Sequence, residues 1–94
     1  MAVYLDNLSD WGWQHGLSCH LIGDSVAELV EFAVSIGLRP EWFQPKSSPH
    51  FDLTVDKRRE AVRRGAVELD RRAFVGKLRE LRNRREELAA SLKV

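Results

Sequence analysis

The sequence of 94 residues contains a single cysteine, Cys19. One cysteine excludes an internal disulfide framework and any zinc site made of several cysteine ligands. Long apolar runs are also missing, since the longest apolar-leaning stretch, residues 32–38, is far too short to cross a bilayer. The N-terminus has neither the basic start nor the apolar segment of a signal peptide. We therefore expect a soluble, cytoplasmic protein.

Internal repeats and low-complexity tracts are absent too, and 94 residues suit one domain with one core. The formal charge of +1 conceals an asymmetry along the chain. Residues 1–56 carry two basic and eight acidic residues, whereas residues 57–94 carry thirteen basic and six acidic ones. This asymmetry predicts either a basic surface that meets an anion, a nucleic acid or an acidic partner, or a well-solvated helical half.

Short apolar stretches and helix-capping signals predict strands that alternate with helices. The clearest helix begins after Ser25, whose spacing to Glu28 is that of a capping box, and ends at Gly37. Thr54 and Asp70 are suited to cap two further helices. The expected strands cover residues 2–5, 18–23, 50–54 and 66–69, and the expected helices cover residues 26–36, 55–64 and 71–92.

This alternation is typical of α/β domains with right-handed crossovers and a largely parallel sheet. We predict one small α/β domain of four short, mainly parallel strands and three principal helices. It should cover residues 1–82, and residues 83–94 should form a C-terminal helical extension. The irregular residues 7–17 contain Trp11 and Trp13, which form either a mobile aromatic flap over a ligand or a plug at the edge of the core.

Polar side chains on the second and third expected strands form the first candidate site. Residues two apart on a strand share a face, so His50 lies beside Asp52, and His20 shares its parity with Asp24. If the strands are neighbours, all four converge at one edge of the sheet. Such a group either binds a divalent metal ion or uses a histidine as general acid or base, oriented by an aspartate. The structural alternative is that the aspartates cap turns and the histidines pack at strand edges.

Cations near the start of the expected helix 55–64 form a second candidate site. Lys57 and Arg58 oppose the helix dipole there, which makes sense if the helix start binds an anion such as phosphate. Lys46 should reach the same region, and solvated surface cations are the alternative. Gln44 and Trp42 are further candidates for ligand contact, although a tryptophan in such a connection more often closes a core.

The motifs occur in an order that resembles a known family. His20-Leu21-Ile22, Asp24-Ser25, Trp42-Phe43-Gln44, Pro49-His50-Phe51-Asp52 and Lys57-Arg58 together resemble DUF4031, small bacterial and phage proteins of unknown function, over roughly residues 2–82. The family's third strand more often reads His-Tyr-Asp, so Phe51 stands in place of a tyrosine. The resemblance implies no activity. It does imply that the His, Asp, Lys and Arg residues of both candidate sites belong to one pattern.

These observations lead to an expected function. We expect the chain to bind a small anionic ligand that is phosphorylated or nucleotide-like. Hydrolysis of that ligand is a further possibility, so the sequence leaves open whether the protein is an enzyme. The histidines would act as acid or base, the aspartates would orient them or hold a divalent metal, and the cations would neutralise the ligand. The alternative is a non-enzymatic interaction module whose basic C-terminal helix binds a protein partner or nucleic acid.

The last expected helix also predicts self-association. Phe74, Leu78, Leu81, Leu88 and Leu92 alternate in spacings of four and three, as in a coiled-coil seam. The second half of this helix has little of the domain left to pack against, so we expect a homodimer through it. A frayed tail is the alternative.

Overall fold

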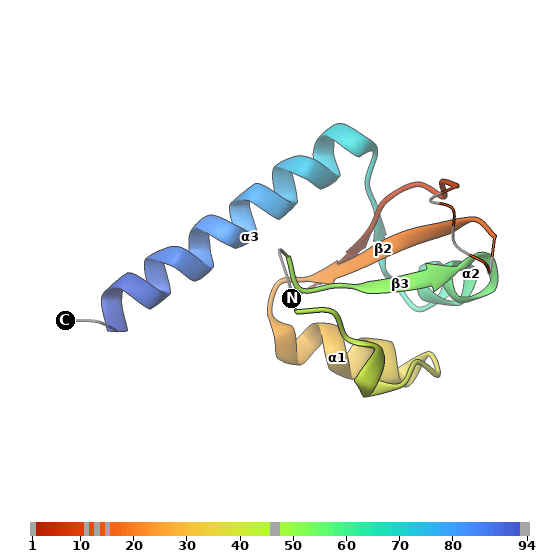
Figure 1. Cartoon of the computed structure of the whole chain (residues 1–94), viewed down its shortest axis with the longest axis horizontal. Coiled ribbons are helices and arrows are strands. Elements are labelled where there is room, and N and C mark those ends of the chain that lie inside the picture. Colours follow the sequence, from red (N-terminus) through yellow and green to blue (C-terminus); the bar gives the residue numbers. More distant parts are fainter. Residues whose placement is uncertain (1, 11, 13, 15, 46–47, 93–94) are drawn as a thin grey trace.

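The computed structural model describes residues 2–92 apart from 11, 13, 15, 46 and 47. A four-stranded sheet lies at the centre of the domain (Figure 1). All the strands and helices expected from the sequence are present. The strands are β1 (Val3–Leu5), β2 (Ser18–Gly23), β3 (Phe51–Thr54) and β4 (Val67–Glu68), and the helices are α1 (Val26–Ser35), the short 3-10 helix η1 (Pro40–Trp42), α2 (Val55–Arg63) and α3 (Arg71–Leu92).

The sheet is mixed, so the prediction of a mainly parallel sheet is wrong. Its order is β3-β2-β1-β4, in which β2 runs antiparallel to both of its neighbours and only β4 pairs parallel to β1. The connection after α1 explains the difference. Gln44 and His50 pair antiparallel through two backbone hydrogen bonds of 3.0 Å, so the chain at His50 runs opposite to the chain at Gln44 and enters β3 beside the end of β2. No single crossover therefore joins β2 to β3.

Local signals in the sequence account for the helix ends. At the start of α1, the Ser25 hydroxyl accepts a hydrogen bond from the Glu28 backbone N–H at 3.2 Å, as the capping box predicts. Gly37 follows α1 with a φ of +89°, a left-handed conformation that favours glycine. Asp70 accepts a hydrogen bond from the Ala73 backbone N–H at 2.8 Å and so caps α3.

The two faces of the sheet bury different sets of side chains. On one face, α1 and α2 cover the main core, which includes Leu21, Phe51 and Leu53 from the strands. Each fully buried side chain of this size contributes about 1.5–3 kcal/mol. On the other face, Phe74 and Leu81 of α3 pack in a smaller cluster around Ile22. The sheet is thus fixed from both sides, although α3 covers only part of its face.

The helix α3 continues well past the sheet, away from the body of the domain (Figure 1). Its 22 residues match the expected range and contribute to a longest dimension of 45 Å, against 26 and 24 Å for the other two. Within the residues described, no helix is long and apolar enough to cross a membrane. The side chains of Leu88 and Leu92, on which the predicted homodimer depends, lie outside the described part of the chain, as do Trp11 and Trp13.

Candidate functional site

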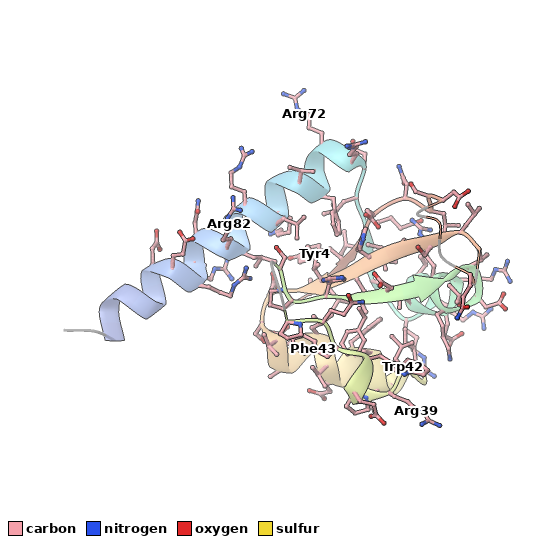
Figure 2. The ribbon with its side chains drawn as sticks, viewed as in Figure 1. Tyr4, Arg39, Trp42, Phe43, Arg72 and Arg82 are labelled. Atoms are coloured by element: carbon pink, nitrogen blue, oxygen red, sulfur yellow. The ribbon has the colours of Figure 1, made fainter. Side chains whose placement is uncertain are left out.

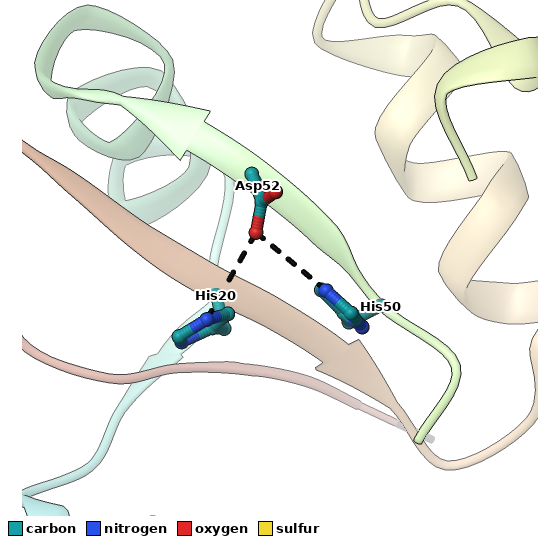
Figure 3. Close-up of side chains that lie close together, drawn as sticks. All are labelled: His20, His50 and Asp52. Carbon is teal, nitrogen blue, oxygen red and sulfur yellow. Dashed lines mark ion pairs between the residues drawn. The ribbon is translucent and has the colours of Figure 1, made fainter. Parts of the chain in front are cut away.

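Two histidines and one aspartate converge on one face of the sheet (Figure 3). His20 on β2 is the register partner of Asp52 on β3, and partners on neighbouring strands point to the same side. His50 lies two residues before Asp52 and therefore shares that side. The Asp52 Oδ1 atom is 3.6 Å from His50 Nε2 and 3.9 Å from His20 Nε2. We call His20, His50 and Asp52 the His/His/Asp cluster.

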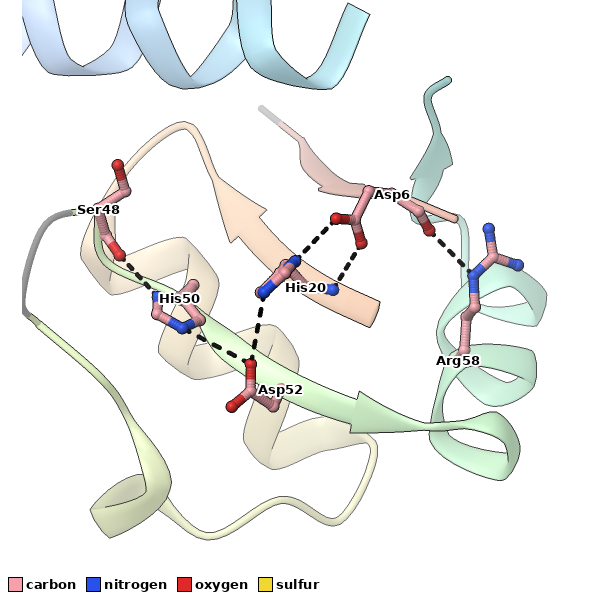
Figure 4. Close-up of polar contacts among 6 residues, drawn as sticks. All are labelled: Asp6, His20, Ser48, His50, Asp52 and Arg58. Atoms are coloured by element: carbon pink, nitrogen blue, oxygen red, sulfur yellow. Dashed lines mark hydrogen bonds and ion pairs between the residues drawn. The ribbon is translucent and has the colours of Figure 1, made fainter. Parts of the chain in front are cut away.

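The opposite ring nitrogen of each histidine has its own hydrogen-bond acceptor (Figure 4). His50 Nδ1 lies 2.7 Å from the carbonyl oxygen of Ser48, and His20 Nδ1 lies 2.7 Å from Asp6 Oδ2. A backbone carbonyl can only accept, so the Nδ1 atom of His50 carries the proton. The Asp6 carboxylate selects the same tautomer for His20. In both neutral rings, Nε2 is then the unprotonated nitrogen, and it points toward Asp52.

Asp6 contacts the cluster and was not singled out from the sequence. Its Oδ1 atom accepts a second hydrogen bond from the His20 backbone N–H at 2.6 Å, so Asp6 fixes both the ring and the main chain of His20. Its carbonyl oxygen in turn accepts a hydrogen bond from Arg58 Nε at 3.2 Å. The signal lay in the register: once β1 and β2 run antiparallel with Leu5 opposite Leu21, Asp6 follows opposite His20. The expectation of parallel strands concealed this pairing.

The electrostatics of the cluster favour a protonated His20 at low pH. The hydrogen bond that His20 donates to the Asp6 carboxylate raises the pKa of His20, and the charges of Asp6 and Asp52 act in the same direction. Burial opposes these effects but does not cancel them. The side chains of His20 and Asp52 remain 31% and 36% exposed, so a small ligand or an ion can reach them.

Gln44 holds the third member of the cluster. Its Nε2 atom donates a hydrogen bond of 2.6 Å to Asp52 Oδ2, which leaves Oδ1 as the oxygen nearest the histidines. The backbone pairing of Gln44 with His50 places this amide beside the site. The sequence singled out Gln44 for contact with a ligand. The structure shows contact with Asp52.

Asp24 does not belong to the cluster, contrary to the sequence prediction of four converging side chains. Its two oxygens accept hydrogen bonds from the Ala2 backbone N–H at 2.8 Å and from the Tyr4 hydroxyl at 2.9 Å. Asp24 follows β2 at the turn into α1, so strand parity no longer governs where its side chain points. The contact with Ala2 and Tyr4 ties the first strand to this turn.

The predicted cations are also placed differently. Lys57 Nζ donates a hydrogen bond of 2.7 Å to the Ile36 carbonyl oxygen at the end of α1, where a positive charge suits the helix dipole. Arg58 pairs with Glu68 at 3.1 Å and reaches the cluster only indirectly, through its bond to Asp6. Lys57 and Arg58 therefore have partners within the fold. The prediction that they lie close to His20, Asp24, His50 and Asp52 is wrong. Lys46 lies outside the described residues.

Trp42 and Phe51 complete the placement of the motif residues. Trp42 is 52% exposed, with the guanidinium of Arg39 6.0 Å from its ring centre (Figure 2), so it does not close the core. Phe51 is fully buried in the main core, on the face of the sheet opposite the cluster. The aromatic ring at this position therefore serves packing, and a hydroxyl there would point away from the His/His/Asp cluster.

Comparison with known proteins gives one result that bears on this site. A family model described as "Protein of unknown function (DUF4031)" matches residues 3–81. The chain belongs to this family. The match includes the whole His/His/Asp cluster together with Asp6 and Gln44, and it confirms the resemblance carried by the sequence motifs. No curated protein and no solved structure matches the chain.

Proposed function

We propose that the His/His/Asp cluster binds a divalent transition-metal ion and that the protein uses this ion to bind and hydrolyse a small phosphorylated ligand. The observation that carries the proposal is the convergence of three ligand atoms, His20 Nε2, His50 Nε2 and Asp52 Oδ1, with both Nδ1 atoms already occupied by acceptors. Metal-ligating histidines nearly always bond their second nitrogen in this way, which fixes the tautomer and the ring orientation.

The distances within the cluster support a metal better than direct pairing. At 3.6 and 3.9 Å, the contacts between Asp52 Oδ1 and the two Nε2 atoms are too long for hydrogen bonds. A tetrahedral ion with bonds near 2.0–2.1 Å would place its ligand atoms roughly 3.3 Å apart. All three atoms lie within 4.8 Å of one another, so small rotations of the side chains suffice to close around an ion.

The donor set indicates the class of metal. Imidazole nitrogens suit zinc, iron(II), cobalt and nickel, whereas magnesium and calcium prefer oxygen ligands. Three protein ligands leave coordination positions for water and for an oxygen of the ligand. Asp6 and Gln44 would act as positioning residues, because each holds one ligand side chain in place.

Hydrolysis follows from the properties of such an ion. Bound water loses a proton to solvent at near-neutral pH, because the ion lowers the pKa of that water toward about 7. The hydroxide oxygen then forms a bond to phosphorus while the ester P–O bond breaks, and the departing alcohol oxygen keeps the bonding electron pair and takes a proton from water. His20 and His50 would serve as ligands here, in place of the acid–base role that the sequence also allowed.

Metal titration tests the proposal directly. Calorimetry with Zn²⁺ and the visible spectrum of bound Co²⁺, both at pH 7.5, should show one site per chain. Asp52→Asn and His50→Ala should weaken binding by about 100-fold or more, since each removes a ligand. Asp56→Asn is the matched control for loss of one carboxylate, because the Asp56 side chain is 91% exposed on α2 and should leave binding unchanged.

Activity is then measured with the chromogenic ester bis(p-nitrophenyl) phosphate and each metal in turn. We expect metal-dependent release of nitrophenol that Asp52→Asn abolishes and Asp56→Asn retains. Thermal unfolding of each variant separates loss of the site from loss of the fold. A wild-type chain that binds neither ion at micromolar concentration, or an Asp52→Asn chain that binds as well as the wild type, would refute the proposal.

A second candidate function rests on α3. The helix extends beyond the domain (Figure 1). Between residues 71 and 87 it carries seven arginine and lysine residues against three glutamates, which supports an interaction module with a protein or nucleic acid. The spacing of its leucines supports a homodimer instead. Light scattering at micromolar concentration tests the homodimer. A dimer mass that Leu88→Asp reduces to a monomer would support it, whereas a monomeric wild type would exclude it at that concentration.

A further inference from the structure

Two hollows lie along the side of α3 that faces the sheet, and Leu78 lines both. The first, of about 270 Å³, opens beside His20 and is also lined by Phe74 and by Arg71 at the start of α3. The second, of about 330 Å³, opens beside Ser48, whose carbonyl oxygen holds His50, and reaches Arg85 farther along the helix. His20 thus lines the first hollow, and the second reaches Ser48 and Pro49, the two residues that precede His50.

The charged side chains that line the two hollows differ in the partners that they have within the fold. Asp6 in the first hollow already accepts hydrogen bonds from His20, and Asp24 in the second accepts them from Ala2 and Tyr4. Arg84 in the second hollow pairs with Glu80 on the exposed surface of α3 at 3.3 Å. Arg71 and Arg85 thus supply positive charge at the opposite ends of the two hollows.

The separation of these arginines indicates an extended ligand. Residues 71 and 85 are fourteen helical steps apart, which is roughly 21 Å along the axis. One phosphate ester at the metal cannot contact both arginines across that length. A chain of several phosphates can, with one phosphate at the His/His/Asp cluster and others near each end.

We infer that the ligand is a single-stranded nucleic acid that lies along α3 across both hollows, with the phosphodiester to be cleaved at the His/His/Asp cluster. This inference rests on the proposed function: it keeps the metal site and the hydrolysis of a phosphate ester, and it replaces the small ligand by a polymer of phosphodiesters. The walls of the hollows are largely apolar, and the apolar side chains most exposed there are Val75 in one and Val26 in the other. Unpaired bases fit such walls, while the phosphates between them fit the arginines. In a duplex the bases pair with one another, so their faces cannot lie against the apolar walls of the hollows.

Cleavage of the strand forms and breaks the same kinds of bond as the ester hydrolysis described above. The oxygen of a metal-bound hydroxide forms a bond to phosphorus, and one P–O bond to a sugar breaks. The sugar oxygen keeps the electron pair and takes a proton from water, which leaves one strand with a terminal phosphate and the other with a terminal hydroxyl.

A pair of double variants tests the ligand class with equal loss of charge. Arg71→Ala/Arg85→Ala removes the arginines at the hollows, whereas Arg72→Ala/Arg79→Ala removes two from the exposed side of the same helix, where Arg72 points away from the domain (Figure 2). Binding of a short, fluorescently labelled single-stranded DNA and RNA is measured by anisotropy between 50 and 200 mM salt, with EDTA present. In the first variant, the fall in affinity over this range should be about sevenfold smaller, because two phosphate contacts are lost. In the second, it should match the wild type.

Each outcome bears on a different claim. Equal effects of the two double variants, or no binding of single strands by the wild type, would overturn the nucleic-acid ligand, even if Co²⁺ binds and bis(p-nitrophenyl) phosphate is hydrolysed. Preferred binding of the matching duplex would overturn it as well. A selective effect of Arg71→Ala/Arg85→Ala in a chain that binds no Co²⁺ would refute the proposed hydrolysis but still support binding of a single strand along the two hollows. Selective binding together with metal-dependent cleavage of the labelled strand would support both.

Discussion

Asp6 offers the sharpest test of how the cluster is organised, because one atom can be changed without altering the shape of the side chain. In the wild type, the His20 backbone N–H donates a hydrogen bond of 2.6 Å to Asp6 Oδ1. In Asp6→Asn, the amide oxygen still accepts this hydrogen bond. The amide nitrogen then takes the place of Oδ2, 2.7 Å from His20 Nδ1. Because that nitrogen is a donor, Nδ1 must become the acceptor and the ring proton moves to Nε2. His20 then presents a proton where the metal would bind.

The size of the effect can be worked out from the bonds exchanged. A hydrogen bond to a charged group contributes about 1.5–3 kcal/mol to the free energy of unfolding, and the neutral hydrogen bond that replaces it contributes about 0.5–1.5 kcal/mol. We therefore expect Asp6→Asn to reduce the free energy of unfolding by about 1 kcal/mol, which corresponds to a melting temperature lower by about 4–8 °C for a domain of this size. Metal affinity should fall about 10- to 100-fold, as for other residues that orient a metal-ligating histidine.

Three measurements check this prediction. Long-range ¹H–¹⁵N spectra report which nitrogen of His20 carries the proton, thermal unfolding reports stability, and Co²⁺ titration reports metal affinity. Asp56→Asn serves again as the control for loss of a carboxylate. If Asp6→Asn keeps the proton on Nδ1 and binds Co²⁺ within twofold of the wild type, then Asp6 does not position His20 and the reasoning fails.

The same pair predicts a pH dependence with a definite sign. The hydrogen bond that His20 donates to the Asp6 carboxylate raises the pKa of His20 above its ordinary value of 6.5, so the folded state favours the protonated ring. The resulting stability is fully present below pH 6.5 and is lost as the pH rises through the raised pKa of the folded protein. Asp6→Asn should therefore destabilise the protein more at pH 6 than at pH 9. Equal destabilisation at both values would contradict this account.

Two further predictions concern residues outside the cluster. Lys57→Ala should lower the free energy of unfolding by about 1 kcal/mol, because the Ile36 carbonyl oxygen loses its charged partner. The substitution should leave Co²⁺ affinity unchanged. A loss of phosphate or metal binding without a loss of stability would instead favour the anion-binding role inferred from sequence. Burial raises the pKa of Cys19 to about 12, so iodoacetamide at pH 8 should modify the unfolded chain in urea and spare the native protein, as mass spectrometry will show.

The sequence was sufficient to predict the secondary structure because each element has a local cause. The capping box at Ser25 and Glu28, the cap at Asp70 and the apolar spacing of α3 involve residues a few positions apart, and all three are present in the structure. Strand direction has no such local cause. The direction of β3 depends on the antiparallel pairing of Gln44 with His50, which forms only when the chain is folded.

The site was predicted in part for the same reason. His50 and Asp52 share a face by strand parity alone, and His20 joins them because β2 and β3 are neighbours, as the sequence reasoning supposed. Asp24 lies past the end of β2, where parity no longer applies, and Asp6 required the antiparallel register of β1 and β2. A basic residue at a helix start suggested an anion site, yet Lys57 is long enough to reach the end of a neighbouring helix.

Family membership and the two parts of the proposal do not cover the same residues. The family match ends at residue 81, so it includes the His/His/Asp cluster, Asp6 and Arg71 but not Arg85. The proposed metal binding thus rests on a region that the family model matches, whereas the far end of the proposed nucleic-acid site rests on this chain alone. Arg85→Ala by itself should then leave the Co²⁺ spectrum unchanged and remove one phosphate contact, which makes the fall in single-strand affinity between 50 and 200 mM salt about 2.6-fold smaller. A changed Co²⁺ spectrum in this variant would show that the proposed nucleic-acid site and the metal site are not separable.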